Sequence, residues 1–114
     1  MSFEKLLEKL QAEYLNTFDE KIQNLVQAAQ ARKIDILVEQ FHKIKGTGLT
    51  HGIPEMSQLG ETMEALCKSK NDEAIQAVPL AVELIRQICL ARSVKQEYPL
   101  SRQEEYLRIL KISR

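Results

Sequence analysis

The chain has 114 residues, of which 44% are hydrophobic and 28% are charged. This length fits one domain, and the apolar fraction is sufficient for a core that needs no disulfides. Sixteen basic residues balance sixteen acidic ones, for a formal net charge of +0. A neutral chain lacks the positive field that general binding of nucleic acid or an acidic membrane requires, so we expect neither partner.

Cysteine usage and the N-terminal residues predict the compartment. Cys67 and Cys89 are the only cysteines and form no C-x-x-C pair, so they indicate core residues in a reducing environment. Residues 1–10 carry four charges in an amphipathic pattern, unlike a secretory leader. No apolar run approaches the roughly 20 residues that cross a bilayer. We therefore expect a cytoplasmic protein.

Apolar residues recur at three- and four-residue spacings along most of the chain, which predicts helices and no strands. The first stripe predicts one long helix, or two joined near residues 16–19, and then a short turn at residues 31–33. The next stripe begins at Ile34 and ends where Gly52 and Pro54 stop the helix. The first stripe comprises Phe3, Leu6, Leu7, Leu10, Tyr14, Phe18, Ile22, Leu25, Val26 and Ala29.

Two longer helices follow. Pro54 opens the first of them, in which Gly60 allows the close approach of a neighbouring helix. This helix ends in the polar residues 68–72, where Asn71 or Asp72 is expected to cap the next one.

The last long helix has Pro79 near its start, as a kink or a new N-terminus, and ends by Pro99. Beyond it, Ser101 and Glu104 have the spacing of a capping box. This pair predicts a short terminal helix that extends through Ile109.

Four amphipathic helices with short connections pack most simply as an antiparallel up-down four-helix bundle. We therefore predict an all-α fold with an extra short terminal helix. Residues 1–114 form one domain, with the bundle core at about residues 10–96 and a C-terminal extension at residues 97–114. Composition alone does not indicate what such a bundle does.

The segment from His42 to Gly52 departs from an ordinary amphipathic helix. A glycine inside a helix costs about 0.5–1 kcal/mol relative to alanine, so each one needs a reason. Gly48 faces inward, where it serves close packing, whereas Gly46 faces outward beside the imidazole and leaves a path to it. On a helical wheel, the residues within about 60° of His42 are Val38, Lys45, Gly46 and Leu49.

An exposed histidine in these surroundings suits phosphoryl transfer. A neutral imidazole is a competent nucleophile near neutral pH. The phosphoryl group that it accepts carries about −1.5 to −2 charges, which Lys45 can stabilise from one turn away. We therefore predict His42 as the phosphoacceptor, with Lys45 and Gly46 completing the reacting site and no bound metal.

The pattern His42-x-x-Lys45-Gly46, with Gly52 at the helix end, resembles the signature of histidine-containing phosphotransfer (HPt) domains. The resemblance covers roughly residues 10–94. It implies a four-helix bundle whose histidine carries phosphate between aspartates of response-regulator receiver domains, with a hybrid sensor histidine kinase as a further partner. It also implies no cofactor in this chain, because the receiver supplies the Mg²⁺ ion.

The resemblance further implies supporting residues. Family members often place a glutamine or glutamate on the following helix, where it orients the histidine ring and fixes its tautomer. Glu64 matches that placement by its spacing, and Glu61 is the second choice. Val38 and Leu49 are expected to form the apolar docking surface for a receiver, with Lys43 beside them.

Simpler interpretations remain open. His42 can be an ordinary surface histidine, and Glu64 a plain solvated residue. Val38 and Leu49 can be isolated exposed apolar residues. His51 is expected to bond to the last carbonyls of its helix, and its spacing from His42 does not suit a metal pair.

The absence of an ATP-binding motif predicts a phosphoryl carrier and not an enzyme. Two rival functions remain. One is a receiver-binding module that carries no phosphate, and the weaker one is a structural bundle that dimerises.

Overall fold

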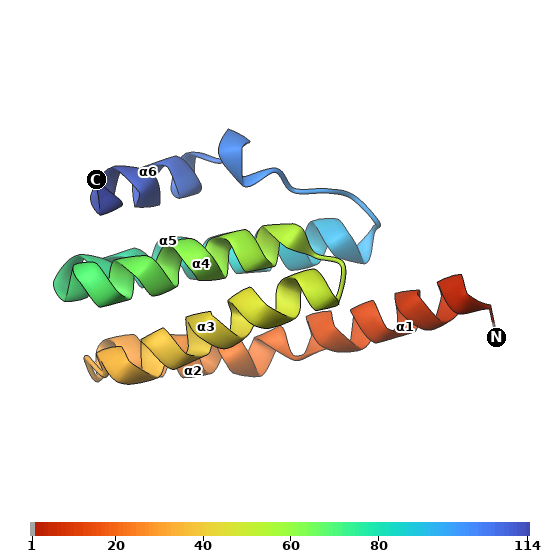
Figure 1. Cartoon of the computed structure of the whole chain (residues 1–114), viewed down its shortest axis with the longest axis horizontal. Coiled ribbons are helices and arrows are strands. Elements are labelled where there is room, and N and C mark those ends of the chain that lie inside the picture. Colours follow the sequence, from red (N-terminus) through yellow and green to blue (C-terminus); the bar gives the residue numbers. More distant parts are fainter. Residues whose placement is uncertain (1) are drawn as a thin grey trace.

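The computed structural model describes residues 2–114, and within that range it consists of helices and contains no strand (Figure 1). The short turn predicted at residues 31–33 is confirmed. The elements are α1 (Phe3–Asn16), α2 (Phe18–Gln30), α3 (Ile34–Thr50), α4 (Pro54–Ser69), α5 (Asn71–Ser93), the short 3₁₀ helix η1 (Leu100–Arg102) and α6 (Glu104–Ser113).

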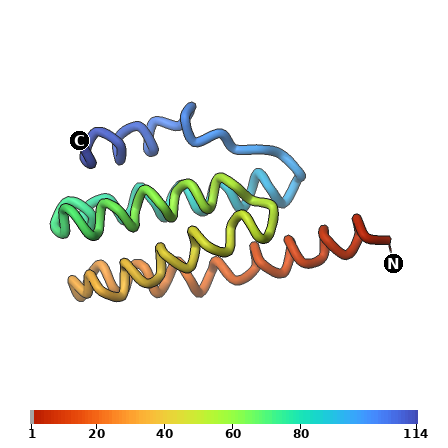
Figure 2. Tube along the Cα trace, in the orientation of Figure 1, coloured from red at the N-terminus to blue at the C-terminus, as the bar shows by residue number. Residues whose placement is uncertain are grey.

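Four helices, α2 to α5, form an antiparallel bundle in which α3, α4 and α5 each run back along the helix before (Figures 1 and 2). α1 and α2 lie roughly in line with a break at Thr17, so the first apolar stripe forms two helices. α1 runs past the end of the bundle, while α6 packs against α5. The predicted all-α bundle and its extra terminal helix are confirmed.

One continuous core lies between the bundle helices. Two aromatic rings, Phe18 of α2 and Phe41 of α3, are fully buried in it, and Tyr14 meets Phe18 edge to face at 5.1 Å between centroids. The other largest fully buried side chains are Leu25, Leu37, Ile44, Ile53, Met56, Leu59, Met63, Leu66, Leu84 and Ile85.

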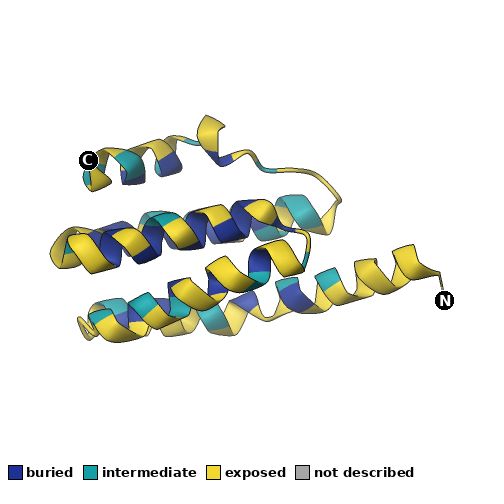
Figure 3. Ribbon diagram, viewed as in Figure 1, coloured by how far each residue is buried: buried dark blue, intermediate teal, exposed yellow. Residues whose placement is uncertain are grey.

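The first four residues of the first stripe are not in this core. Phe3, Leu6, Leu7 and Leu10 are all exposed. The stripe is helical, as predicted, but α1 extends beyond the bundle, where no other helix of residues 2–114 covers it (Figure 3). Burial begins only at Tyr14, three residues before the break.

The turn between α3 and α4 confirms the predicted helix stop. Gly52 has φ +75°, a left-handed conformation that glycine adopts without a Cβ clash. The amide of Ile53 donates to the carbonyl of Gly48 at 2.8 Å, which closes the last turn of α3, and Pro54 begins α4.

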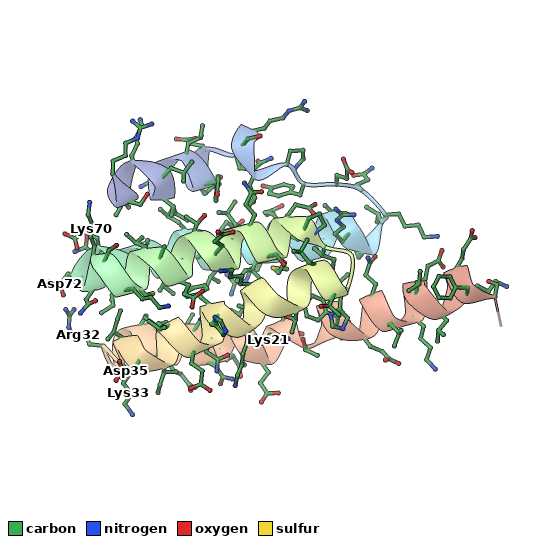
Figure 4. All side chains as sticks on the ribbon, viewed as in Figure 1. Lys21, Arg32, Lys33, Asp35, Lys70 and Asp72 are labelled. Carbon is green, nitrogen blue, oxygen red and sulfur yellow. The ribbon has the colours of Figure 1, made fainter. Side chains whose placement is uncertain are left out.

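The predicted cap at the start of α5 is wrong. α5 begins at Asn71, and Lys70 occupies the cap position without a side-chain hydrogen bond to the helix. Asp72 instead pairs with Arg32 from the turn between α2 and α3, at the same end of the bundle (Figure 4).

α5 does not extend to Pro99, and Pro79 lies inside it. The helix ends at Ser93 because Lys95 adopts a left-handed conformation, with φ 61°. The amide of Gln96 then donates to the carbonyl of Ala91 at 2.9 Å, as in a helix-ending Schellman motif. Glycine is the usual residue at this position, so the sequence carried no stop signal here.

The predicted capping box of Ser101 and Glu104 is also wrong. Ser101 lies within η1, and Gln103 occupies the cap position of α6 without a side-chain hydrogen bond. α6 continues through Ser113, past the predicted end at Ile109.

Two glycines set the close contact between α3 and α4. A Cβ added at Gly48 would lie 2.5 Å from Ser57 Oγ, and one added at Gly60 would lie 2.6 Å from the backbone nitrogen of Lys45. Both distances are too short for any side chain, so the predictions of inward packing at Gly48 and close approach at Gly60 are confirmed. This contact fixes α4 against the helix that carries His42.

A buried ion pair ties the C-terminal segment to the bundle. Glu55 of α4 accepts hydrogen bonds from Arg92 Nε at 3.1 Å, from Arg92 Nη2 at 2.5 Å and from the amide of Tyr98 at 2.8 Å. Burial alone would raise the pKa of Glu55, but these donors outweigh it and hold the pKa below its ordinary value of 4.5.

Glu55→Gln is therefore expected to lower the free energy of unfolding at neutral pH by about 2–3 kcal/mol, because a buried guanidinium loses its counter-ion. The carboxylate stabilises the wild type fully above about pH 4.5, and this contribution is lost as the pH falls through the lower folded-state pKa. Urea unfolding over this pH range measures both effects. A variant as acid-sensitive as the wild type, or equally stable at neutral pH, would contradict the assignment.

Among the helices of residues 2–114, α5 alone is long and apolar enough to cross a membrane, with a mean hydropathy of 1.5 over its most apolar window. Most of its apolar side chains line the bundle core. Both cysteines are free thiols, and burial raises the pKa of Cys67 and of Cys89 to about 11. They are protonated near neutral pH and pack as small apolar residues.

Candidate functional site

His42 lies on the outer side of α3, where the helical wheel places it. Phe41, the residue before it, and Ile44 are fully buried and orient α3 against the core. The His42 side chain is 69% exposed, so a second protein can reach the imidazole.

Glu64 of α4 holds one side of this ring. Its Oε2 lies 2.9 Å from His42 Nδ1, and the glutamate side chain is only 9% exposed. Burial alone would raise the pKa of Glu64, but hydrogen bonds from Lys68 and then His42 outweigh it and keep the pKa below its ordinary value. The group is a carboxylate at neutral pH, which can only accept hydrogen bonds, so the imidazole proton resides on Nδ1.

Two lysines share the same carboxylate. Lys68 Nζ lies 3.2 Å from Glu64 Oε2, and Lys45 Nζ lies 3.9 Å from Glu64 Oε1. Lys45 thus stands beside the imidazole, as the wheel suggested. Lys68 was not predicted from the sequence, although its spacing of four residues from Glu64 along α4 is the signal of a helical ion pair.

Gly46 leaves the approach to His42 open. A Cβ added at this position would meet no atom within 4 Å, so no packing reason accounts for this mid-helix glycine. A surface hollow adjoins it between α3 and α4. Its lining residues are His42, Lys45, Gly46, Leu49, Pro54, Ser57, Gln58 and Glu61.

Ser57 fixes the helix turn beneath this hollow. Its hydroxyl donates to the carbonyl of Lys45 at 2.7 Å and accepts from the amide of Leu49 at 2.6 Å. These two backbone groups face each other across one turn of α3. The bridge from α4 therefore sets the position of Lys45, Gly46 and Leu49 relative to Glu64.

The remaining predicted residues divide into two groups. Leu49 is 68% exposed and lines the hollow, whereas Val38 is half-buried and packs against the core. Val38 therefore offers less docking surface than the sequence suggested. Lys43 pairs with Glu39 at 3.0 Å, one turn earlier on α3. Glu61 is exposed at the rim of the hollow, without the bond to His42 that Glu64 makes.

His51 is held in place at the C-terminal end of α3. Its Nδ1 lies 2.8 Å from the carbonyl oxygen of Thr47, and its ring stacks on Tyr14 with 4.1 Å between centroids. This confirms the expected bond to the last carbonyls. In the range 2–114, no three His, Cys, Asp or Glu side chains gather as a metal site would require.

The arrangement is an exposed imidazole whose Nδ1–H donates to the Glu64 carboxylate, with a lysine and an open glycine beside the ring. None of the hydrogen bonds within residues 2–114 involves His42 Nε2, so this nitrogen presents a lone pair to solvent. Such a group can take a phosphoryl group from a donor that docks over the hollow.

A comparison with protein-family models matches residues 9–96 to the Hpt domain. The chain belongs to the Hpt domain family, and the resemblance noted in the sequence is confirmed. Members of this family are phosphocarrier modules of two-component phosphorelays, and they interact with response-regulator receiver domains and kinases. Comparisons with curated proteins and with solved structures gave no match to this chain.

Proposed function

We propose that this chain carries a phosphoryl group on His42 between receiver-domain aspartates in a multistep phosphorelay. The observation that carries the proposal is the bond between Glu64 and His42 Nδ1, because it leaves the exposed Nε2 as the nucleophile. We further propose that the chain acts in the cytoplasm and exchanges phosphate with response-regulator receivers and a hybrid sensor histidine kinase. It has no cofactor of its own, and the receiver supplies Mg²⁺.

The transfer is a displacement at phosphorus. The Nε2 lone pair of His42 forms the new N–P bond, while the P–O bond to the donor aspartate breaks and its electron pair stays on the carboxylate oxygen. The ring thereby gains a positive charge, which the Glu64 carboxylate balances across the bond to Nδ1. Lys45 stands beside the ring and stabilises the phosphoryl oxygens. The reverse displacement passes the group to a second receiver.

Docking places the donor over the hollow beside His42. Leu49 provides exposed apolar surface there. Val38 and Lys43 lie outside the lining of the hollow, and we expect them to contact the receiver along α3. Gly46 leaves room for the receiver's active-site loops. The chain itself contributes position, charge and access, and the energy of the transfer comes from the acyl phosphate of the donor.

Mass spectrometry of the intact protein tests the proposal. The chain is incubated with purified receiver domains that have been phosphorylated by acetyl phosphate, and its mass is measured at neutral pH. We expect a mass gain of one phosphoryl group that is lost in acid, as is typical of phosphohistidine. Binding to a phosphorylated receiver without any mass gain would instead favour the alternative, a receiver-binding module that carries no phosphate.

Glu64→Ala tests the role of the carboxylate. The loss of a charged hydrogen bond, about 1.5–3 kcal/mol, is expected to slow phosphorylation of His42 by about tenfold or more. Nitrogen NMR of the imidazole should show Nδ1 protonated in the wild type and a mixture of both tautomers in the variant. Glu61→Ala, on the same helix, serves as the control and should change neither measurement. An unchanged tautomer in Glu64→Ala would show that Glu64 does not orient the ring.

A further inference from the structure

Within residues 2–114, no helix covers four large apolar side chains on one face of α1. Phe3, Leu6, Leu7 and Leu10 are between 43% and 74% exposed, and we call them the α1 patch. Their spacings of three, one and three residues place them on a single face. Soluble proteins rarely expose a contiguous apolar face of this kind unless it binds something.

The α1 patch adjoins the site on α3. Leu7 and Leu10 line a surface hollow together with Leu49, and Leu49 also lines the hollow beside His42. Gln11 Nε2 donates to the carbonyl of His51 at 3.1 Å, which joins α1 to the end of α3. The apolar surface is therefore continuous from the phosphoacceptor site, through Leu49, to the projecting part of α1.

The size of a stable interface indicates that one partner covers both parts. A specific complex buries about 800 Å² on each side, roughly a disc of 16 Å radius. Leu49 lies seven residues from His42, about 10 Å along α3. A partner centred on His42 therefore extends past Leu49 onto α1. Leu49 is also the one aliphatic side chain larger than proline in the hollow beside His42, so a partner docked there alone would find little apolar surface.

We infer that the α1 patch is the second half of the receiver-docking surface, and that it selects which receiver exchanges phosphate with His42. This inference rests on the proposed function, since the occupant is the receiver that reaches His42. Three of the four patch residues, Phe3, Leu6 and Leu7, precede the segment that matches the family at residues 9–96. The patch is thus an addition to the shared bundle, which suits a role in partner choice and not in the transfer itself.

The kinetics of phosphate transfer from a phosphorylated receiver test the inference. Purified receiver domains are phosphorylated with acetyl phosphate, and the receiver that transfers fastest to the wild-type chain is kept as the probe. The double variant Leu7→Glu/Leu10→Glu is expected to raise KM for this receiver by about tenfold or more. The maximal rate should change little, because the patch acts in docking and not at the reacting atoms.

The control is Lys5→Gln/Lys9→Gln, which makes the same change in net charge on the side of α1 away from Leu7. It should leave KM within about twofold of the wild type. Phosphorylation by phosphoramidate, which needs no docking, should be equal in all three proteins. Circular dichroism checks the fold, and Phe3→Glu/Leu6→Glu, on the first turns of α1, replaces the first pair if that pair does not fold.

The outcomes separate the two proposals. If the wild type takes phosphate from the receiver and the patch variant has an unchanged KM, the inference about α1 is wrong and the proposed function stands. If analytical ultracentrifugation also shows a wild-type dimer that the patch variant dissociates, a second copy of the chain covers the patch. If no receiver transfers phosphate to the wild type, the proposed function is wrong and this inference is wrong with it.

Discussion

His42→Gln is expected to abolish phosphate acceptance from every receiver while the bundle remains folded. Glutamine has no nucleophilic nitrogen comparable to Nε2, so no N–P bond can form. The side chain is exposed, and Glu64 keeps Lys45 and Lys68 as partners after the substitution. The melting temperature should therefore change by only a few degrees. Radiolabelled phosphate transfer and thermal unfolding by circular dichroism measure the two effects.

His51→Gln is the matched control, since it removes the only other histidine. His51 has a structural role, because its Nδ1 bonds to the carbonyl of Thr47 and its ring stacks on Tyr14. This variant should accept phosphate at a rate close to that of the wild type, with some loss of stability. Phosphate on His51, or acceptance that survives in His42→Gln, would overturn the assignment of the site.

Gly46→Gln is expected to separate stability from function. The position is open, and glutamine is a better helix former than glycine, so the free energy of unfolding should be kept or raised by about 0.5–1 kcal/mol. The new side chain occupies the space one turn from His42 that the donor phosphate must enter. A misplacement of about 1 Å at a reacting centre costs on the order of a hundredfold in rate. We expect a stable protein with strongly slowed transfer.

Gly46→Ala provides the comparison, because alanine gives at least as large a gain in helix propensity with only a single methyl group. It should be stabilised to a similar extent and slowed much less. Transfer reactions with a phosphorylated receiver, quenched at timed intervals, give the transfer rate of each variant. Urea unfolding gives the free energy of unfolding. Wild-type transfer rates in Gly46→Gln would mean that access does not explain this glycine.

The placement of His42 was predictable because it depends only on helical periodicity. Once Phe41 and Ile44 face the core, the geometry of the helix places His42 outside and Gly46 beside it. The pairing with Glu64 was harder to predict, since it depends on how closely α4 approaches α3. Gly60 indicated this close approach, but only the packed structure shows that the Glu64 carboxylate is buried.

The features that the sequence did not reveal depend on tertiary context. The apolar stripe of α1 has the same spacing whether or not a partner helix covers it, so periodicity could not distinguish buried Tyr14 from exposed Leu7. The end of α5 depends on the left-handed conformation of Lys95. A lysine does not predict that conformation, whereas a glycine would. The four-residue spacing of Lys68 from Glu64 can be read from the sequence. Its link to the site cannot, because Lys68 acts through the same Glu64 carboxylate that binds His42.

The most direct measurement is a two-step relay with labelled phosphate. A receiver carrying labelled aspartyl phosphate is mixed with this chain and with a second, unlabelled receiver, and the label is followed over time. We predict that the label leaves the first receiver, appears on His42 and then reaches the second receiver, and that no label crosses when His42→Gln replaces the wild type. Direct release of labelled inorganic phosphate, with none ever bound to the chain, would contradict the account.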